Sequence, residues 1–215
     1  MLKLYGRATS INVQKVMWLL GEIGLAHERI DIGGKFGGLQ TAEFRALNPH
    51  ARIPVIDDDG VTVWESHAIL RYLAAKYAPE RFWPADPAAR STPDRWMDWA
   101  QASMQPDFTG GVFWGYYRTP EPRRDKAAVA RAIADCAAHL QLLDRWLEGR
   151  DFLCGDALTL ADIPTGVQLH RHYEMGIERP RAPNVDAWYA RLCARPAYQN
   201  GVMIAFEELK GRLDF

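Results

Sequence analysis

The chain has 215 residues, of which 48% are hydrophobic and 25% are charged, so it can form a substantial core and is not wholly disordered. The formal net charge is −1, which gives no electrostatic basis for binding nucleic acid or an anionic membrane surface. Three widely spaced cysteines argue against a disulfide framework and fit a reducing compartment. We therefore expect a soluble cytoplasmic protein without a leader peptide or a membrane-spanning segment.

The first part of the chain alternates strand-like and helix-like patterns. Some stretches repeat apolar residues at helical spacing, and shorter ones alternate as strands do. The run Asp57-Asp58-Asp59-Gly60 marks a hairpin turn rather than a cation site. We expect strands at 2–6, 26–32, 54–56 and 61–64, and helices at 11–24, 41–47 and 66–77. This order predicts a small α/β domain at residues 1–78.

Prolines separate this domain from a helical remainder. Residues 79–89 hold three prolines without apolar periodicity, which indicates a linker. Beyond it, apolar residues step by threes and fours from Val129 to Leu147, and a similar pattern runs from Val185 to Leu192. We therefore predict an all-helical C-terminal domain over residues 90–215.

Small polar residues stand where the first helix begins. Thr9, Ser10 and Asn12 follow the first strand, and residues of these types are the preferred N-caps of helices. The same position suits an anion, because unpaired amides and the positive end of the helix favour negative charge. Both roles stay open, since one hydroxyl can cap the helix while its neighbour faces a ligand.

An acid and a hydroxyl stand at the start of the third helix. Ser66 is the expected N-cap there, and Glu65 could hold the amine of a zwitterion whose carboxylate meets Ser66. Thr159 and Asp162 have the spacing of a capping box, which serves folding rather than catalysis.

The remaining motifs do not indicate phosphate or metal chemistry. The glycine-rich loop 33–38 lacks the G-x-G-x-x-G pattern. His170 and His172 lie two residues apart in a helical stretch and point in different directions, so we expect no metal site. The aromatic stretch 107–118 is compatible with core packing or with a pocket for a flat apolar ligand.

Several segments agree in order and spacing with one known family. They are LYGRATSINVQKVMWLL, NPHARIPVI followed by WESHAILRYLA, FWPADPAAR, and GDALTLAD. Together they resemble the cytosolic glutathione S-transferase family, in its bacterial, serine-type branch related to the theta and beta classes. The resemblance implies a thioredoxin-like N-terminal domain, an all-α C-terminal domain and usually a homodimer. It also implies a detoxification enzyme that joins glutathione, its co-substrate, to a small hydrophobic electrophile.

The resemblance assigns roles to individual residues. It implies a cis bond before Pro54, which turns the main chain of Ile53 toward the cysteinyl part of glutathione. Further contacts are expected from Glu65 and Ser66 at the γ-glutamyl end, from Arg52 at the glycyl carboxylate, and from Lys35 or Gln40.

Ser10 matches the serine that activates the thiol in the serine-type classes. A free thiol has a pKa of about 8.5, and lowering it by about two units requires about 2.7 kcal/mol. A hydrogen bond to a charged group supplies about 1.5–3 kcal/mol and a helix end up to about 2. Thr9, with Asn12 nearby, is the rival donor. No cysteine lies at positions 7–15, which argues against the classes that form a mixed disulfide with glutathione.

The electrophile site is expected to draw on Arg7, Phe108, Phe113, Trp114 and Tyr117. One alternative is a non-catalytic module that keeps the fold for binding glutathione or for interaction, although a pure scaffold need not keep the glutathione-binding residues. Another alternative is a glutathione-dependent isomerase, dehalogenase or peroxidase.

Overall fold

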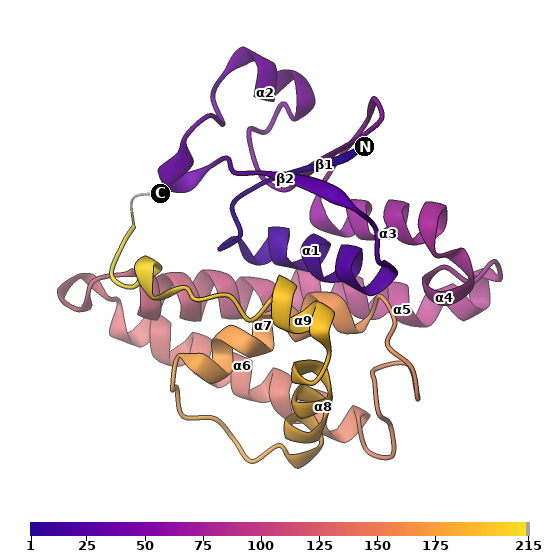
Figure 1. Ribbon diagram of the computed structural model, residues 1–215. Coiled ribbons are helices and arrows are strands. Elements are labelled where there is room, and N and C mark those ends of the chain that lie inside the picture. Colours follow the sequence, from indigo (N-terminus) through magenta and orange to yellow (C-terminus); the bar gives the residue numbers. More distant parts are fainter. Residues whose placement is uncertain (214–215) are drawn as a thin grey trace. The chain divides into compact units, whose positions relative to one another are not determined.

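The computed structural model describes residues 1–213, which form two compact units (Figure 1). The first unit comprises Met1–Ala85 and Pro196–Ile204, and the second comprises Asp86–Arg195 and Ala205–Leu213. The α/β layer and the helical unit expected from the sequence are thereby confirmed. Within residues 1–213, no helix combines the length and the apolar character needed to span a membrane.

A mixed sheet with strand order β2-β1-β3-β4 organises the first unit. Its strands are β1 Leu2–Tyr5, β2 His27–Ile30, β3 Val55–Asp58 and β4 Val61–Trp64. β1 runs parallel to β2 and antiparallel to β3, and β3 runs antiparallel to β4. Tyr5 pairs with Ile30 and Val55, and Val55 also pairs with Trp64. The C-terminal ends of β1, β2 and β4 therefore meet the N-terminal end of β3 at one edge of the sheet.

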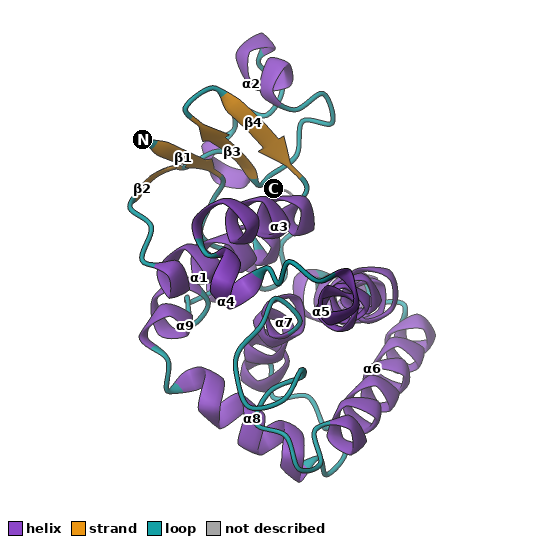
Figure 2. Cartoon of the chain, turned by 90° about the vertical axis from the view of Figure 1, so that its right-hand side faces the viewer, coloured by secondary structure: helices purple, strands orange, loops and turns teal. Residues whose placement is uncertain are grey.

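Helices complete the first unit, and α1 and α3 lie on the same face of the sheet (Figure 2). They pack their apolar sides inward, at the helical spacing that the sequence shows. The helices of the unit are α1 Ile11–Ile23, α2 Ala42–Leu47, α3 Ser66–Tyr77, α4 Pro79–Phe82 and α9 Pro196–Gly201, with a 3₁₀ turn η1 Gly34–Phe36. The fully buried residues of α1 and α3 include Val13, Val16, Leu20, Ile69, Leu70 and Leu73.

The C-terminal helix α9 packs with the first unit, whereas the sequence analysis placed all of 90–215 in the helical domain. Two contacts with α1 explain this difference. The rings of Trp18 and Tyr198 meet edge to face with centroids 4.7 Å apart. A Cβ atom added to Gly201 would lie 2.9 Å from the main-chain nitrogen of Trp18, so only glycine allows this close approach.

The named elements of the second unit are all helices. α5 Pro87–Trp99 continues through π-helical segments η2 Ala100–Met104 and η3 Pro106–Arg118, because Ala100 and Gln105 keep right-handed helical torsions. The other elements are η4 Glu121–Arg123, α6 Lys126–Trp146, α7 Asp162–Glu174, α8 Pro183–Cys193 and η5 Glu207–Leu209.

The stretch 79–89, expected to be a linker, contains α4 and the first turn of α5. Asp86 caps α5, because its carboxylate accepts hydrogen bonds from the amides of Ala88 and Ala89. Pro87 occupies the first helical position, where its missing N–H removes no helical bond. Proline therefore starts a helix here rather than excluding one.

Asp162 anchors the start of α7 as a buried acceptor. Its carboxylate accepts from the amide of Leu153 at 2.9 Å and from the amide of Thr159 at 2.8 Å. Burial raises the pKa of Asp162 to about 6, although these hydrogen bonds oppose the shift. The predicted capping pair is present, but the Thr159 hydroxyl accepts from the amide of Ala161, and the helix begins at Asp162 itself.

Glycines in η3 serve helix packing. A Cβ atom added to Gly111 would lie 2.4 Å from the Cβ atom of Ala132, and one added to Gly115 would lie 3.3 Å from a methyl group of Val129. Both partners belong to α6. Glycine at these two positions therefore lets η3 and α6 approach each other closely.

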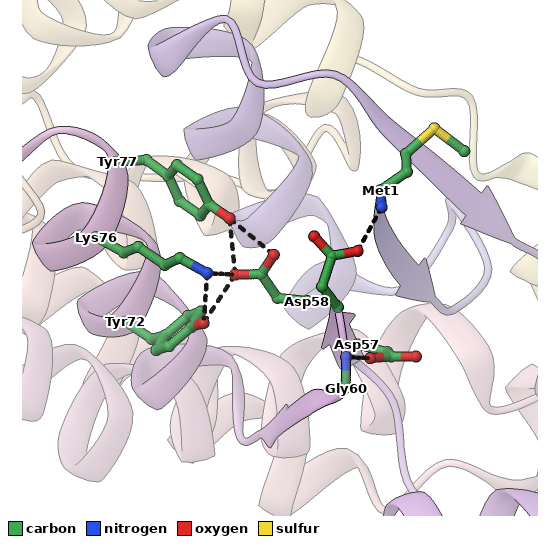
Figure 3. A network of polar contacts seen from close by, with 8 residues as sticks. Met1, Asp57, Asp58, Gly60, Tyr72, Lys76 and Tyr77 are labelled. Atoms are coloured by element: carbon green, nitrogen blue, oxygen red, sulfur yellow. Dashed lines mark hydrogen bonds and ion pairs between the residues drawn. The ribbon is translucent and has the colours of Figure 1, made fainter.

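A buried carboxylate joins the end of β3 to the C-terminal half of α3 (Figure 3). Asp58 is 2% exposed and accepts hydrogen bonds from Tyr72 and Tyr77 at 2.7 Å and from Lys76 at 2.6 Å. Burial alone would raise the pKa of Asp58, but the bonds from Lys76, Tyr77 and Tyr72 outweigh burial and lower it. The charged form of Asp58 therefore stabilises the fold.

Replacing Asp58 tests this network. Asp58→Asn removes the charge and should lower the free energy of unfolding at neutral pH by about 2 kcal/mol, measured by urea denaturation. A carboxylate with a lowered pKa in the folded state stabilises above its unfolded pKa of about 3.9 and loses that contribution as pH falls further. The difference between wild type and variant should therefore shrink below about pH 4.

Asp59→Asn is the matched control for this experiment. Asp59 is exposed and pairs with the amino group of Met1, and such surface pairs contribute less than about 1 kcal/mol. Equal losses of stability in the two variants at every pH would contradict the role given to Asp58.

Candidate functional site

The register of the sheet brings the predicted site residues to one edge. The segment after β1 carries Ser10, the segment before β3 carries Ile53, and the segment after β4 carries Glu65 and Ser66. Because these strand ends meet, the helix starts of α1 and α3 face the same edge. Free amides at two helix starts favour negatively charged groups there.

The surroundings of Gly6 and Gly33 show that the segments after β1, after β2 and before β3 approach one another closely. A Cβ atom added to Gly33 would lie 3.4 Å from Nη1 of Arg7 and 3.4 Å from Cδ1 of Ile53. One added to Gly6 would lie 2.4 Å from a methyl group of Val13 and 3.4 Å from the Cβ atom of Ile53. The side chains of Arg7 and Ile53 therefore both lie against the segment that follows β2.

Ser10 occupies the N-cap position of α1 but does not cap it with its side chain. Its torsions are extended (φ −83°, ψ 123°), and its carbonyl accepts from the amide of Gln14 at 2.9 Å. The hydroxyl makes no hydrogen bond to the amides of α1. Of the two roles that the sequence left open, side-chain capping is therefore absent, and the hydroxyl and the first-turn amides remain available to a ligand.

Glu65 holds the N-cap position of α3, one residue before the predicted cap Ser66. Its φ of 69° and ψ of 118° are unusual for a residue with a side chain. Ser66 is buried at the first helical position, while Glu65 is exposed and makes no capping bond. A conformation of this kind costs about 1–3 kcal/mol and is typical of functional sites, because the surrounding structure must impose it.

The loop before β3 is held by a residue that the sequence analysis did not single out. Asn48 is buried, donates from Nδ2 to the carbonyl of Arg52 at 2.9 Å, and accepts from the amide of His50 at 3.0 Å. The bond between Ile53 and Pro54 is cis, as predicted. Sheet pairing of β3 begins only at Val55, which leaves the main chain of Ile53 at the edge of the sheet.

The cationic candidates of this edge are on the surface. Arg52 and Lys35 are exposed, and the Lys35 ammonium lies 5.5 Å from the ring centroid of Phe36. Gln40 is also exposed, and its side-chain oxygen accepts from Nε of Arg45 at 3.2 Å. Their contacts therefore leave these long side chains able to reach a bound molecule.

The sequence analysis also did not predict a buried polar contact between α1 and α3. Lys15 on α1 is completely buried, and its Nζ atom lies 3.2 Å from Nε2 of His67 on α3. Gln14 beside it is buried as well, and neither side-chain polar atom of Gln14 has a hydrogen-bond partner within residues 1–213. A lysine next to apolar residues in a helix gives no sequence signal that distinguishes burial from exposure.

The aromatic residues predicted for the electrophile pocket lie in the second unit, and most are buried. Phe113 and Tyr117 stack with centroids 5.6 Å apart, and Phe206 closes the cluster. Phe108 is fully buried, whereas Trp114 is 37% exposed. Core packing therefore accounts for Phe108, Phe113 and Tyr117, and Trp114 presents an accessible ring.

The two histidines of α7 lie in separate contacts, and the three cysteines are thiols with raised pKa values. Nδ1 of His170 lies 3.2 Å from the Tyr189 hydroxyl, whereas His172 packs against another ring, so the two point apart as predicted. Burial raises the pKa of all three cysteine thiols, and that of Cys136 to about 12. Within residues 1–213, no three or more His, Cys, Asp or Glu side chains are grouped to hold a metal ion.

Two hollows of the surface lie away from these residues. One of about 570 Å³ lies between α1 and α9, and one of about 430 Å³ lies between α5 and α6. Neither is lined by a residue predicted for the site. These two hollows therefore do not coincide with the candidate site, which rests on the sheet register and the helix starts.

Comparison with known proteins gives the family. A model described as "Glutathione S-transferase, N-terminal domain" matches residues 1–75, and one described as "Glutathione S-transferase, C-terminal domain" matches residues 97–196. The chain belongs to the glutathione S-transferase family. Glutathione S-transferase GstB of Escherichia coli K12 is 37% identical over 206 residues, covering 95% of this chain and 99% of that protein.

Solved structures of the family agree with this assignment. A theta class glutathione S-transferase from Xanthomonas axonopodis pv. citri with glutathione bound has a TM-score of 0.90 and 45% identity, covering 95% of this chain and 98% of that one. A Burkholderia graminis glutathione transferase with two glutathione molecules bound per subunit has a TM-score of 0.83 and 32% identity, covering 94% and 87%. The predicted family, fold class and type of enzyme are therefore confirmed.

The backbone of Glu65 yields a test of the site's internal strain. Glu65→Gly should raise the free energy of unfolding by about 1 kcal/mol relative to Glu65→Ala, because glycine adopts a positive φ without a Cβ clash. Both variants lose the carboxylate, so the difference isolates the backbone. Urea denaturation measures it, and an alanine variant as stable as the glycine variant would contradict the strain.

Proposed function

We propose that this glutathione transferase binds glutathione at the sheet edge, stabilises its thiolate with Ser10, and directs the sulfur to a hydrophobic electrophile. The observation that carries the proposal is the Ser10 hydroxyl, which stands at the start of α1 without a capping bond. A thiolate placed there would receive one hydrogen bond from the hydroxyl and the favourable field of the helix end. The glutathione bound to the Xanthomonas relative supports the choice of ligand.

The rest of the tripeptide would be held by main chain and by charge. The main chain of Ile53, presented before Pro54, would pair with the cysteinyl part. The carboxylate of Glu65 would accept a hydrogen bond from the γ-glutamyl amine. The γ-glutamyl carboxylate of glutathione would contact Ser66 and the first amides of α3. Arg52 would face the glycyl carboxylate, and Lys35 and Gln40 would assist at that end.

The electrophile would contact aromatic and cationic side chains. Trp114 offers an exposed ring, and the buried rings of Phe108, Phe113 and Tyr117 support the helix that carries it. Arg7, which like Ile53 lies against Gly33 in the segment after β2, would contribute charge near the sulfur. An apolar wall of this kind suits a flat hydrophobic substrate and a role in detoxification.

The protein would act in the cytoplasm as a homodimer. The three cysteines are free, which supports a reducing compartment. The dimer follows from the family resemblance, and sedimentation equilibrium of the purified protein should give about twice the mass of the chain. A single species of monomer mass at micromolar concentration would remove the dimer from the proposal.

Ser10 is tested through the ionisation of bound glutathione. Ser10→Ala removes the hydroxyl and should raise the thiol pKa of bound glutathione by about one to two units, since one charge-assisted hydrogen bond of about 1.5–3 kcal/mol is lost. The pKa is measured from the ultraviolet absorbance of the thiolate as pH is varied. Turnover of an aryl halide at neutral pH should fall about tenfold or more.

Thr9→Val is the matched control, because it removes the neighbouring hydroxyl and keeps the shape of the side chain. An unchanged thiol pKa in Ser10→Ala with a raised one in Thr9→Val would transfer the role to Thr9, with Asn12 as its neighbour. Binding of glutathione without turnover of any electrophile would favour the non-catalytic module.

A further inference from the structure

The contact between Lys15 and His67 joins α1 to the first turn of α3. His67 is the second residue of α3 and follows Glu65 and Ser66, the pair assigned to the γ-glutamyl end of glutathione. The Nζ atom of Lys15 lies 3.2 Å from Nε2 of His67, and both side chains are buried. Burying an ammonium group lowers the stability of the fold unless the group is hydrogen-bonded, so the contact with His67 matters for stability.

The direction of this hydrogen bond follows from the charges. Burial and the nearby charges of Lys15 and Arg71 lower the pKa of His67 to about 2, so His67 is neutral. While Lys15 is charged its ammonium can only donate, so Nε2 of His67 accepts and the ring proton lies on Nδ1. The charged form of Lys15 thereby fixes the imidazole in one tautomer.

Lys15 itself is poised between two charge states. Burial lowers the pKa of Lys15 to about 7, and the negative charge of Glu65 opposes that shift. His67 and Arg71 on α3 and Glu65 at its start are the titratable groups that act on this pair. The helix α9, which packs against α1, carries Tyr198 as its ionisable side chain, and that ring contacts Trp18.

We propose that Lys15 is a positioning residue for glutathione: it holds the first turn of α3 through His67 and supplies positive charge behind the helix start that receives the γ-glutamyl carboxylate. This inference rests on the proposed function, because it assumes that binding mode. Lys15 does not touch the ligand. It acts through the orientation of α3 and through its charge.

A dependence of affinity on pH follows. A ligand carboxylate at the start of α3 favours the charged form of Lys15, so its pKa is higher in the complex than in the free protein. The added affinity is fully present below the pKa of about 7 in the free protein and is lost as pH rises through the pKa in the complex. Glutathione should therefore bind more weakly on the alkaline side of neutrality.

The probe that isolates this effect is S-methylglutathione, which has no thiol to ionise. Its affinity is measured by calorimetry from about pH 6 to about pH 8. Its carboxylates stay charged over this range, and the partial deprotonation of its amine near pH 8 acts equally on wild type and variants. Wild-type affinity should fall about fivefold across this range, a coupling typical of linked sites. Lys15→Met should bind about tenfold more weakly at the acidic end and show only the smaller fall that the ligand's own amine causes near pH 8.

Two further variants complete the design. Lys3→Met removes a half-buried lysine of β1 by the same substitution and should keep both the affinity and the pH profile of wild type. His67→Leu removes the acceptor of Lys15 and should move the fall in affinity to lower pH, because the ammonium loses its partner. Lys15→Met exchanges a buried charge for an apolar side chain of similar length, which proteins commonly tolerate.

The pH profile separates positioning from a merely structural role. Wild-type affinity and pH profile in Lys15→Met would overturn the proposal, and so would weakened binding with an unchanged pH profile. A wild-type protein that fails to bind S-methylglutathione at any pH would overturn the proposed function, and this inference with it.

Discussion

The pairing of Val55 with Tyr5 on one side and with Trp64 on the other decides which chain segments meet. A shift of one residue in either ladder would turn every side chain of that strand to the opposite face, so the buried core enforces the register. With this register, the segments after β1 and β4 both reach the edge where β3 begins. Two helix starts then face the same edge of the sheet, which a loop scaffold without a fixed sheet could not guarantee.

Two carboxylates of the first unit, Asp58 and Glu65, have contrasting surroundings. Asp58 is buried and accepts hydrogen bonds from tyrosine and lysine side chains, so its charge stabilises the fold itself. Glu65 is exposed, makes no capping bond, and stands on a strained backbone. A carboxylate that the fold holds in place, but that makes no capping hydrogen bond, is suited to accepting one from a ligand.

Local signals in the sequence predicted most of the first unit. The turn at Asp57-Asp58-Asp59-Gly60 and the apolar spacing after it gave β4 and α3 with their observed ends. Features that depend on contacts between distant residues were not accessible. Proline bonds are cis in only about 5–6% of cases, so the isomer came from the family resemblance. The burial of Lys15 arises from α3 packing over it, and the placement of α9 arises from the close contact of Gly201 with α1.

The two ends of α3 are held by different chemistry, and this prepares the site before a ligand arrives. At the C-terminal end, Tyr72 and Tyr77 bind Asp58 and fix the helix to β3. At the N-terminal end, His67 binds Lys15 and fixes the helix to α1. A helix fixed at both ends keeps its first amides in place, so a bound carboxylate need not order them. The buried lysine and the strained Glu65 reduce stability, which is the cost of holding the start of α3 in this arrangement.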